Sequence, residues 1–589
     1  MMPSTILVIG CGPAGMSFCH AMETRKQEMI AAGEDVSILP KVTALERAPG
    51  PGGVWRSSRT NGANECIDEK KEANEVVDTS NMYEGLWTNG PKESIEFFDY
   101  SYDEHFGHAL PVYMPRQALL EYMLTRVTRR CPHFFEKYAR FNNDVQSVAW
   151  NEGTSKFDVV IRDTLTENIS RETYDKCIWG AGDNGKQKMP HSMVKMFRKG
   201  GFTGRMIHSS DTANFEEDVK GKRILMIGGS YSSEDLALTA IKVGAEMIYI
   251  SSRQEDSVVT LTAAWPNNKV KLLLEMQPVQ ITEEGKCIEF AEVEQKHGEV
   301  FVVSDEIETK IRNIDTVIFC TGYQSNLDML SEDLRKPFNI DDDPLSCPID
   351  VPQDWQMEDT LLPEHLQGIK PSISLWSYSS VSYPDIFMWT LIENPNMMFI
   401  YGEDSDHPIL ATDAIAWLLA SISTGQYILP TPEEQRRLNR EQALREMATY
   451  PAIRVEMDSN FYNHVVSTWD HYPKGQQEKL WQEYYTDVAA YDLCLYAQAM
   501  RDGQYPLDIG SIVGLNEAGK EIARMDHLST MHRRTLDKTN KDENMWRTFR
   551  DIKDSSSFKS IITGTVAVPL KKRWIEIDDA NDSDILVPE

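Results

Sequence analysis

Apolar and polar positions follow a clear pattern at the start of the chain. Residues 6–9 form an unbroken apolar run rich in β-branched side chains, which predicts a buried strand because the run is too short for a helix. Residues 16–22 resume with apolar and small side chains at helical spacing. A turn with Gly10, Gly12 and Gly15 lies between them. The pattern therefore predicts a strand, a tight glycine turn and a helix in succession.

A second succession of the same kind lies near the middle of the chain. Residues 221–227 predict another buried strand, a small-residue turn from Gly228 to Ser230 follows, and then a helix. Serines stand where the second and third glycines would be, so this motif is weaker than the first. The strand that comes next, residues 247–252, ends directly before Arg253.

Other stretches predict elements that carry no chemistry of their own. Residues 27–41 predict an elongated connection between the first helix and the second strand. Residues 315–323 predict a buried strand with a glycine turn, at which the chain returns to its first domain. The remaining predicted elements are a helix over residues 115–129, strands over 141–148, 157–161, 177–182 and 394–402, and a helix over 412–422.

The first glycine turn has the spacing of a dinucleotide-binding motif. Gly10 permits the tight turn, Gly12 lets the backbone approach a pyrophosphate, and Gly15 lets the helix pack on the strand. The helix N-terminus offers amide groups and a positive dipole to the phosphate. Glu46 ends the second strand, where an acidic side chain can hold a ribose hydroxyl. A lone glycine motif is as often an ordinary turn, but this context favours a dinucleotide site.

In the second unit, the residue at the end of the next strand is basic, Arg253, where the first unit has the acidic Glu46. An arginine at the position of Arg253 can accommodate the 2′-phosphate of NADP, whereas a surface arginine without a ligand is the alternative. One dinucleotide fold with an acid and one with a base predict FAD and NADPH as the two cofactors.

Composition excludes several classes of protein. The 589 residues carry a net charge of −31, which argues against nucleic acid or an anionic membrane as the main partner. The hydrophobic content of 41% fits a globular protein with a full core. No apolar run approaches the ~20 residues of a membrane span.

Cysteine usage points to a reducing compartment. The nine cysteines form no C-x-x-C pair, and their odd number argues against a disulfide framework, so we expect a cytoplasmic protein. No spacing typical of metal ligands is present, and we expect no metal site.

Residues 202–209 carry a more specific signal. Phe202, Gly204, His208 and Ser209 resemble the F-x-G-x-x-x-H-S fingerprint of class B flavin-dependent monooxygenases, and they precede the second nucleotide fold as in that class. Within the class, nearly the whole chain is similar to the bacterial trimethylamine monooxygenases. The stretches that carry this similarity are residues 86–93, 103–107, 230–235, 320–323, 548–551 and 563–565.

The resemblance implies an α/β fold with two Rossmann-like dinucleotide-binding domains, the smaller inserted in the larger, and a mostly helical C-terminal extension. The FAD-binding domain would comprise residues 1–190 and 326–430, and the NADPH-binding domain residues 191–325. Residues 431–589 would pack on the FAD-binding domain.

The resemblance also implies an activity. NADPH would reduce the flavin, O2 would add to form a C4a-hydroperoxyflavin, and the nitrogen or sulfur of a small amine or sulfide would attack the distal oxygen. Trimethylamine, oxidised to its N-oxide, is the first candidate substrate. Asn89 and Asp404 would be the catalytic residues, with Asn89 bonded near the peroxide and Trp87 on the nicotinamide side.

The same likeness assigns cofactor contacts to individual residues. FAD would contact Gly12, Ala14, Glu46, Val54, Trp55 and Val145, and NADPH would contact Ser230, Ser232 and Arg253. The other expected cofactor residues are Gly10, Pro13, Gly15, Gly53, Trp87, Asn89, His208, Gly228, Tyr231, Thr321 and Gly322.

The chain departs from the family pattern at two places that bear on the substrate. Thr212 stands where the class has an aromatic residue, and Glu403, Asp406 and His407 replace the Gln, Trp and Tyr of the trimethylamine enzymes. Three alternatives stay open: a Baeyer–Villiger or N-hydroxylating monooxygenase, a non-oxygenating NADPH flavin reductase, and a regulatory protein on the same scaffold. The expected partners are O2 and a small amine or sulfide, and a homodimer is among the possible assemblies.

Overall fold

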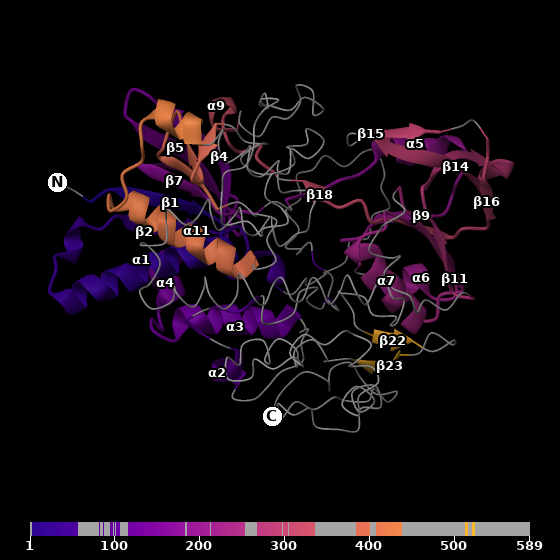
Figure 1. The fold of residues 1–589 in the computed structure, drawn as a ribbon, viewed down its shortest axis with the longest axis horizontal. Helices are drawn as coiled ribbons and strands as arrows, with labels where there is room; N and C mark the ends of the chain where they lie inside the picture. The colour runs from indigo at the N-terminus through magenta and orange to yellow at the C-terminus, as the bar shows by residue number, and fades with distance from the viewer. Residues whose placement is uncertain are drawn as a thin grey trace, which may run out of the picture.

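The computed structural model describes the following parts of the chain. They are residues 3–56, 82, 86, 95–97, 99–100, 102–106, 116–182, 185–212, 214–253, 268–296, 299–303, 306–324, 326–335, 385–400, 408–438, 513–515 and 521–524. Two sheets, one mainly and one wholly parallel, dominate these residues and lie at opposite ends of the molecule in Figure 1.

The first sheet has seven strands within the described residues, in the order β19-β20-β21-β7-β1-β2-β3. The run from β21 to β3 is parallel, whereas β20 and β19 extend it in antiparallel fashion. The strands are β1 (Thr5–Ile9), β2 (Lys41–Leu45), β3 (Ala139–Arg140), β7 (Lys176–Trp179), β19 (Ile386–Phe387), β20 (Thr390–Leu391) and β21 (Met397–Phe399).

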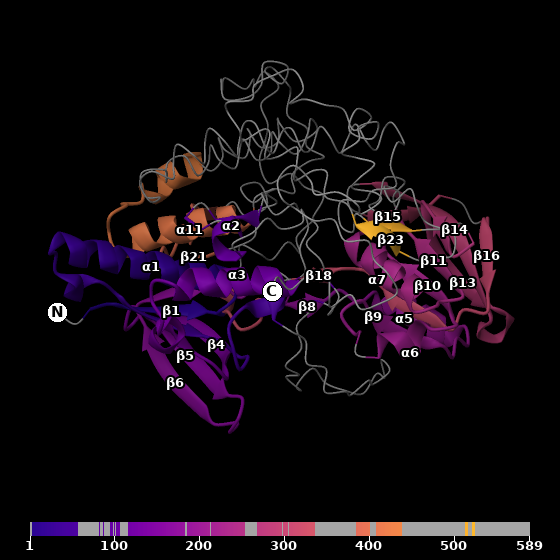
Figure 2. The same ribbon diagram turned by 90° about the horizontal axis from the view of Figure 1, so that it is seen from below.

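Alternating side chains of β1 build the two layers around this sheet. Ile6 and Val8 pack with α1 (Pro13–Ala32), α3 (Arg116–Thr128) and α11 (Pro408–Ser423). Leu7 and Ile9 point the other way, into a cluster with the antiparallel meander. The meander consists of β4 (Asn143–Asn151), β5 (Lys156–Asp163) and β6 (Ile169–Tyr174). Figure 2 shows the helices on one side of β1 and the meander on the other.

The second sheet is parallel throughout its described strands, in the order β12-β11-β10-β17-β9. Ile224 and Met226 of β10 face α6 and α7, and Leu225 and Ile227 face α5 and a second antiparallel meander. Their bounds are β9 (Arg205–His208), β10 (Arg223–Ile227), β11 (Met247–Ser251), β12 (Val270–Leu273), β17 (Thr316–Phe319), α5 (His191–Lys199), α6 (Phe215–Val219), α7 (Tyr231–Lys242), β13 (Met276–Thr282), β14 (Cys287–Lys296), β15 (Glu299–Val302) and β16 (Thr309–Arg312). The two halves therefore repeat one plan.

A two-stranded ribbon joins the halves. The chain leaves the first sheet after β7 and returns after β17, and these crossing segments pair as β8 (Lys186–Gln187) and β18 (Tyr323–Gln324). Figure 1 shows β18 between the two sheets. The remaining elements are α2 (Tyr102–Phe106), α4 (Phe134–Tyr138), α9 (Glu332–Arg335), β22 (Val513–Leu515), β23 (Glu521–Arg524) and the 3-10 turns Val36–Ile38, Gly53–Trp55 and Glu283–Gly285.

The predicted α/β fold with two dinucleotide-binding units is confirmed, with two local corrections. α1 continues to Ala32 and ends at Gly33 in the left-handed region, so the predicted connection over residues 27–41 is largely helix at its start. Only Met29 is buried among residues 27–32, so this end of the helix has no amphipathic period. β17 belongs to the second sheet, and the return to the first begins only after it. No helix in the described parts of the chain combines the length and apolarity needed to cross a membrane.

Candidate functional site

The first glycine turn connects β1 to α1 and packs closely against backbone at Gly10 and Gly15. Gly10 has φ of +95°, and a Cβ there would lie 2.8 Å from the carbonyl oxygen of Gly180. A Cβ at Gly15 would lie only 2.1 Å from the carbonyl oxygen of Gly10. Both positions thus need glycine for packing, as the motif predicts. A Cβ at Gly12 would meet only the backbone of Gly53, at 3.4 Å.

The N-terminus of α1 lies open to an anion. Gly12 is the N-cap, no side chain caps the first amides, and Pro13 occupies the first turn. Unsatisfied amides at a helix N-terminus bind phosphate readily. Glu46 follows β2 and is buried beside the turn, where its carboxylate accepts hydrogen bonds from the amides of Cys11 (2.8 Å) and Ala48 (2.9 Å). Glu46, the residue predicted to bind the ribose, therefore lies next to the helix N-terminus predicted to bind the phosphate.

A glycine-rich loop, residues 52–56, closes over this turn and is called the FAD loop below. The amide of Gly52 donates to the carbonyl of Cys11 at 2.9 Å, and a Cβ at Gly53 would lie 3.0 Å from the Cα of Gly12. The loop also contains the predicted FAD residues Val54 and Trp55, which are partly exposed.

Two more predicted FAD residues lie close by. Ala14 is partly buried in the first turn of α1 and packs against the core cluster of the first sheet. Val145 on β4 is buried in the cluster with Leu7 and Ile9, so its side chain belongs to the core, and its contact with FAD stays a prediction. An uncapped helix N-terminus, a buried acid and close glycine backbones together fit a flavin dinucleotide.

The second turn repeats this geometry. Gly228 has φ of +113°, and a Cβ there would lie 2.2 Å from the carbonyl oxygen of Cys320 at the end of β17. Its amide donates to Ser251 at 2.9 Å, just as the amide of Gly10 donates to Leu45 at 2.8 Å. Each turn is thus held by the next strand of its sheet.

The predicted NADPH residues surround this second turn. Ser230 is the exposed N-cap of α7 without a side-chain cap, and Tyr231 and Ser232 begin the helix. Arg253 is exposed beyond the end of β11. Nucleotides bind at the carboxyl ends of parallel strands, where these residues and the first turn lie. The residues therefore fit NADPH, because Arg253 lies at the strand end where an arginine can bind the 2′-phosphate.

His208 at the end of β9 is bonded within the chain. Its Nε2 lies 3.1 Å from the carbonyl oxygen of Gly322, and its Nδ1 lies 3.0 Å from the hydroxyl of Ser210. Burial lowers the pKa of His208 to about 4, so the ring is neutral and Nε2–H donates to the carbonyl. Thr321, also predicted to meet a cofactor, donates its hydroxyl to the carbonyl of Lys188. Through its bond to Gly322, His208 stabilises the chain next to the crossing ribbon. Its contact with a cofactor stays a prediction.

The other fingerprint residues have packing roles in this structure. Phe202 is buried and packs edge-on against Phe197, with ring centroids 5.3 Å apart. A Cβ at Gly204 would lie 2.4 Å from the ring of Phe202 and 2.5 Å from the carbonyl oxygen of Asp315. The fingerprint thus shapes the start of β9 and fixes its end.

Several predicted residues lie outside the described part of the chain. They are Trp87, Asn89, Glu403, Asp404, Asp406 and His407. Thr212, which replaces the usual aromatic residue, is described and lies just after β9.

Sequence reasoning missed three residues that shape the sites. Gly180 and Cys320 end the strands that close the two turns, and their role depends on strand order, which is non-local. Arg116 is buried to 1% exposure, and its guanidinium donates to the carbonyl of Arg56 in the FAD loop. The only available signal was its position directly after a proline at the start of a predicted helix.

Each of the two sheets carries a glycine turn that leads into a helix, and the N-terminal amides of each helix can bind a phosphate. Two such units define a flavoprotein class that binds two dinucleotides. The sequence model described as pyridine nucleotide-disulphide oxidoreductase matches residues 4–342. The chain therefore belongs to the pyridine nucleotide-disulphide oxidoreductase family. Within it, relatives identify a flavin-dependent monooxygenase with FAD and NADPH as its cofactors.

Those relatives are trimethylamine monooxygenases. The enzyme from Methylocella silvestris is 27% identical over 477 residues, which cover 81% of this chain and 86% of the relative. The one from Roseovarius nubinhibens is 31% identical over 336 residues, covering 57% and 64%. Among solved structures, Tmm from a Pelagibacter strain has a TM-score of 0.58 at 22% identity and covers 89% of this chain and 95% of its own. That likeness supports the fold.

Proposed function

We propose that the chain oxygenates the nitrogen or sulfur of a small nucleophile with NADPH and O2, and that trimethylamine, yielding its N-oxide, is the first substrate to test. The observation that carries the proposal is the 27% identity over 81% of the chain to an enzyme named trimethylamine monooxygenase. The route of oxygen activation that the resemblance implies, and the predicted domain boundaries, are parts of the same proposal.

The chain's own contribution is binding, orientation and exclusion of water. When bound, NADPH supplies the hydride and FAD supplies the activation of O2. The first turn of α1 and Glu46 would hold FAD, and Ser230, Ser232 and Arg253 would hold NADPH. Closing both turns with backbone, as Gly180 and Cys320 do, keeps the two helix N-termini in fixed places.

Asn89 is proposed to donate a hydrogen bond where charge develops on oxygen, and Asp404 to lie near the flavin. A preorganised donor in such a site typically contributes ~2.7–4 kcal/mol to the stabilisation of a developing oxyanion. The alternative for Asn89 is that its amide caps a turn, a common use of Asn before Gly.

The test is Asn89→Ala, with Asn168→Ala as the matched control, because Asn168 is exposed on the hairpin between β5 and β6. The holoenzymes are compared for NADPH consumption, H2O2 release and N-oxide formation from trimethylamine. Asn89→Ala is expected to keep FAD and oxidise NADPH while product falls at least tenfold and H2O2 rises. Asn168→Ala is expected to behave as wild type.

Coupled product formation in Asn89→Ala would make Asn89 structural. Substrate identity is decided by a panel of amines and sulfides on wild type, because Glu403, Asp406 and His407 depart from the trimethylamine enzymes. H2O2 as the sole oxygen product with every member would instead establish the reductase.

A further inference from the structure

One face of helix α3 contacts the FAD loop at both of its ends. Arg116, the first residue of the helix, is almost wholly buried, and its guanidinium donates to the carbonyl of Arg56. Leu120 lies one helical turn further along the same face. A Cβ built on Gly52 would lie 2.5 Å from the side chain of Leu120, so this side chain fills the space beside Gly52. Residues 52 and 56 of the loop therefore each meet a side chain of α3.

The FAD loop also meets the first glycine turn. The amide of Gly52 donates to the carbonyl of Cys11 at 2.9 Å, and a Cβ at Gly53 would lie 3.0 Å from the Cα of Gly12, the N-cap of α1. The loop therefore connects α3 to the helix N-terminus at which the FAD pyrophosphate is expected to bind.

The FAD loop is a short link with its own hydrogen bonds. It contains the 3-10 turn Gly53–Trp55. The amides of Trp55 and Arg56 donate to the carbonyls of Gly52 and Gly53 at 3.1 and 3.2 Å. Because Arg56 is bonded to Gly53, a displacement at Arg56 changes the position of the backbone that lies against Gly12.

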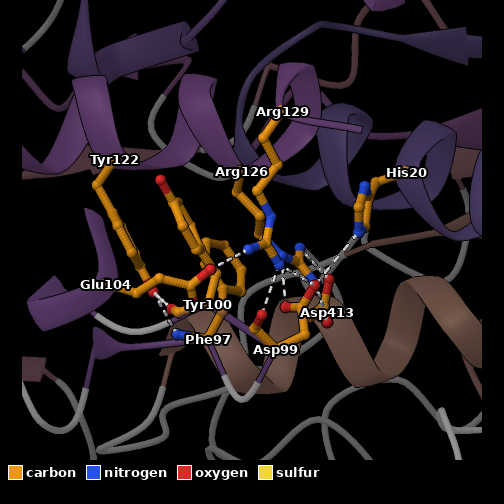
Figure 3. A network of polar contacts seen from close by, with 9 residues as sticks. All are labelled: His20, Phe97, Asp99, Tyr100, Glu104, Tyr122, Arg126, Arg129 and Asp413. Carbon is orange, nitrogen blue, oxygen red and sulfur yellow. Dashed lines mark hydrogen bonds and ion pairs between the residues drawn. The ribbon is translucent and has the colours of Figure 1, made fainter. Parts of the chain in front are cut away.

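The other end of α3 is fixed in the core, as Figure 3 shows. Arg126 bonds Asp99 at 2.8 Å and forms a two-point pair with Asp413 of α11 at 2.7 and 2.9 Å. Asp413 and Arg126 are almost wholly buried, at 0% and 2% exposure. His20 of α1 lies 3.7 Å from Asp99. The helix that carries Arg116 is thus held to both α1 and α11.

The chemistry of arginine suits a rigid hold on a backbone carbonyl. A guanidinium stays protonated at every physiological pH and directs its N–H groups from a planar frame. A charged donor binds a carbonyl more strongly than a neutral donor does. Arg116 is therefore a strong and well-oriented donor to the FAD loop.

We propose that Arg116 is a positioning residue for FAD: from α3 it holds the FAD loop against the first glycine turn, and Leu120 supports the same contact. The proposal rests on the part of the proposed function that assigns FAD to the first turn. A binding site keeps its geometry when supporting side chains are themselves locked by packing and hydrogen bonds. Since changes in affinity act mostly on dissociation, loss of the contact should speed the release of FAD.

The main test variant is Arg116→Met, which removes the charge and the donors and keeps an unbranched side chain. Leu120→Ala is a second variant, because it weakens the same face of α3 without touching Arg116. The matched control is Arg205→Met, since Arg205 is also partly buried and forms an ion pair with Asp218 at 2.6 Å, but in the unit of the second sheet.

The variants are prepared as holoenzymes and measured in two ways. The dissociation rate of FAD is followed by flavin fluorescence after dilution. Hydrogen exchange is measured in peptides that contain residues 52–56, with peptides from β5 as an internal reference.

Arg116→Met is expected to speed both FAD dissociation and exchange in the FAD loop at least tenfold, the equivalent of about 1.4 kcal/mol. Exchange in β5 should stay at its wild-type rate. Leu120→Ala should change both quantities in the same direction by a smaller factor, and Arg205→Met should change neither.

The outcomes separate anchoring, positioning and general stability. Unchanged exchange in the FAD loop of Arg116→Met would overturn the anchoring. Faster exchange there with wild-type FAD dissociation would overturn the positioning role. Faster exchange throughout the chain, β5 included, would show that Arg116 only stabilises the fold and would also overturn it.

Two further results have a defined meaning. If Arg116→Met does not fold, Leu120→Ala decides, and wild-type exchange and FAD dissociation in that variant would overturn the proposal. A wild-type enzyme that binds FAD but oxygenates no substrate would refute the proposed oxygenation and leave this inference standing, because neither measurement involves a substrate or O2.

Discussion

Gly12 and Gly15 at the start of α1 have different roles. Gly15 is needed for packing, Gly12 for the approach of a ligand, and Gly15→Ala tests the packing role. A new Cβ at Gly15 would lie 2.1 Å from the carbonyl oxygen of Gly10, whereas real contacts stay beyond 3.0 Å, so α1 or the Gly10 carbonyl must shift until the two atoms are about 0.9 Å further apart (3.0 minus 2.1). Overpacking of this kind costs about 1–3 kcal/mol of unfolding free energy. For a domain of this size that corresponds to a fall in Tm of roughly 2–12 °C.

Gly12→Ala tests the ligand role at the same turn. Gly12 has φ of −78° and ψ of −167°, which alanine adopts freely, and its Cβ would make only an ordinary contact of 3.4 Å with Gly53. The flavin-free variant should therefore unfold at the wild-type temperature, or slightly higher because the unfolded chain loses ~0.4–1 kcal/mol of entropy. Its dissociation constant for FAD should nevertheless rise at least tenfold, since a methyl group now occupies the approach of the pyrophosphate.

Both variants are measured without flavin by thermal unfolding, followed through tryptophan fluorescence, and then titrated with FAD. We expect opposite profiles, with Gly15→Ala losing stability and Gly12→Ala losing affinity. Wild-type affinity in Gly12→Ala would show that the turn does not face the pyrophosphate. Wild-type Tm in Gly15→Ala would refute the packing reasoning.

Two further predictions concern the second half of the molecule. Arg253→Ala should raise the apparent KM for NADPH by roughly 10- to 150-fold, the equivalent of about 1.5–3 kcal/mol for a lost charge-assisted bond, and barely change that for NADH; equal losses with both would remove the 2′-phosphate assignment. His208 has a pKa of about 4 against an ordinary 6.5, so its neutral form contributes stability that is complete above pH 6.5 and is lost as the pH falls towards 4. Curves of Tm against pH should therefore be shallower over that window in His208→Gln than in wild type, and parallel curves would contradict the assignment.

Local chemistry could be predicted from the sequence, and long-range pairing could not. The glycine turns, Glu46 and Arg253 follow one another within short stretches whose periodicity is clear, and the structure places them at the strand ends as expected. The extended end of α1 was missed because its exposed turns carry no apolar period. The pairing of Arg126 with Asp413 joins residues 287 positions apart, and no single-sequence pattern indicates such a contact.

His208 shows how contacts within the chain add to what a fingerprint suggests. The resemblance implies a cofactor contact for His208, which stays a prediction, and the structure adds contacts of its ring nitrogens with Gly322 and Ser210. A fingerprint reports that a residue matters for a class of proteins, but it does not indicate a partner such as Gly322, which lies 114 residues from His208.

The strand order has a consequence for biosynthesis. β21 pairs with β7 but is made 218 positions after it (residue 397 against residue 179), whereas all strands of the second sheet lie between residues 205 and 319. At ~5–20 residues per second, the ribosome needs on the order of 10–40 s to supply β21, while the second sheet can already close. During that interval one edge of the buried strand β7 lacks its partner, which is the kind of edge that recruits other chains. Newly made chains are thus most exposed to aggregation, and most dependent on chaperones, before residue 400 has emerged.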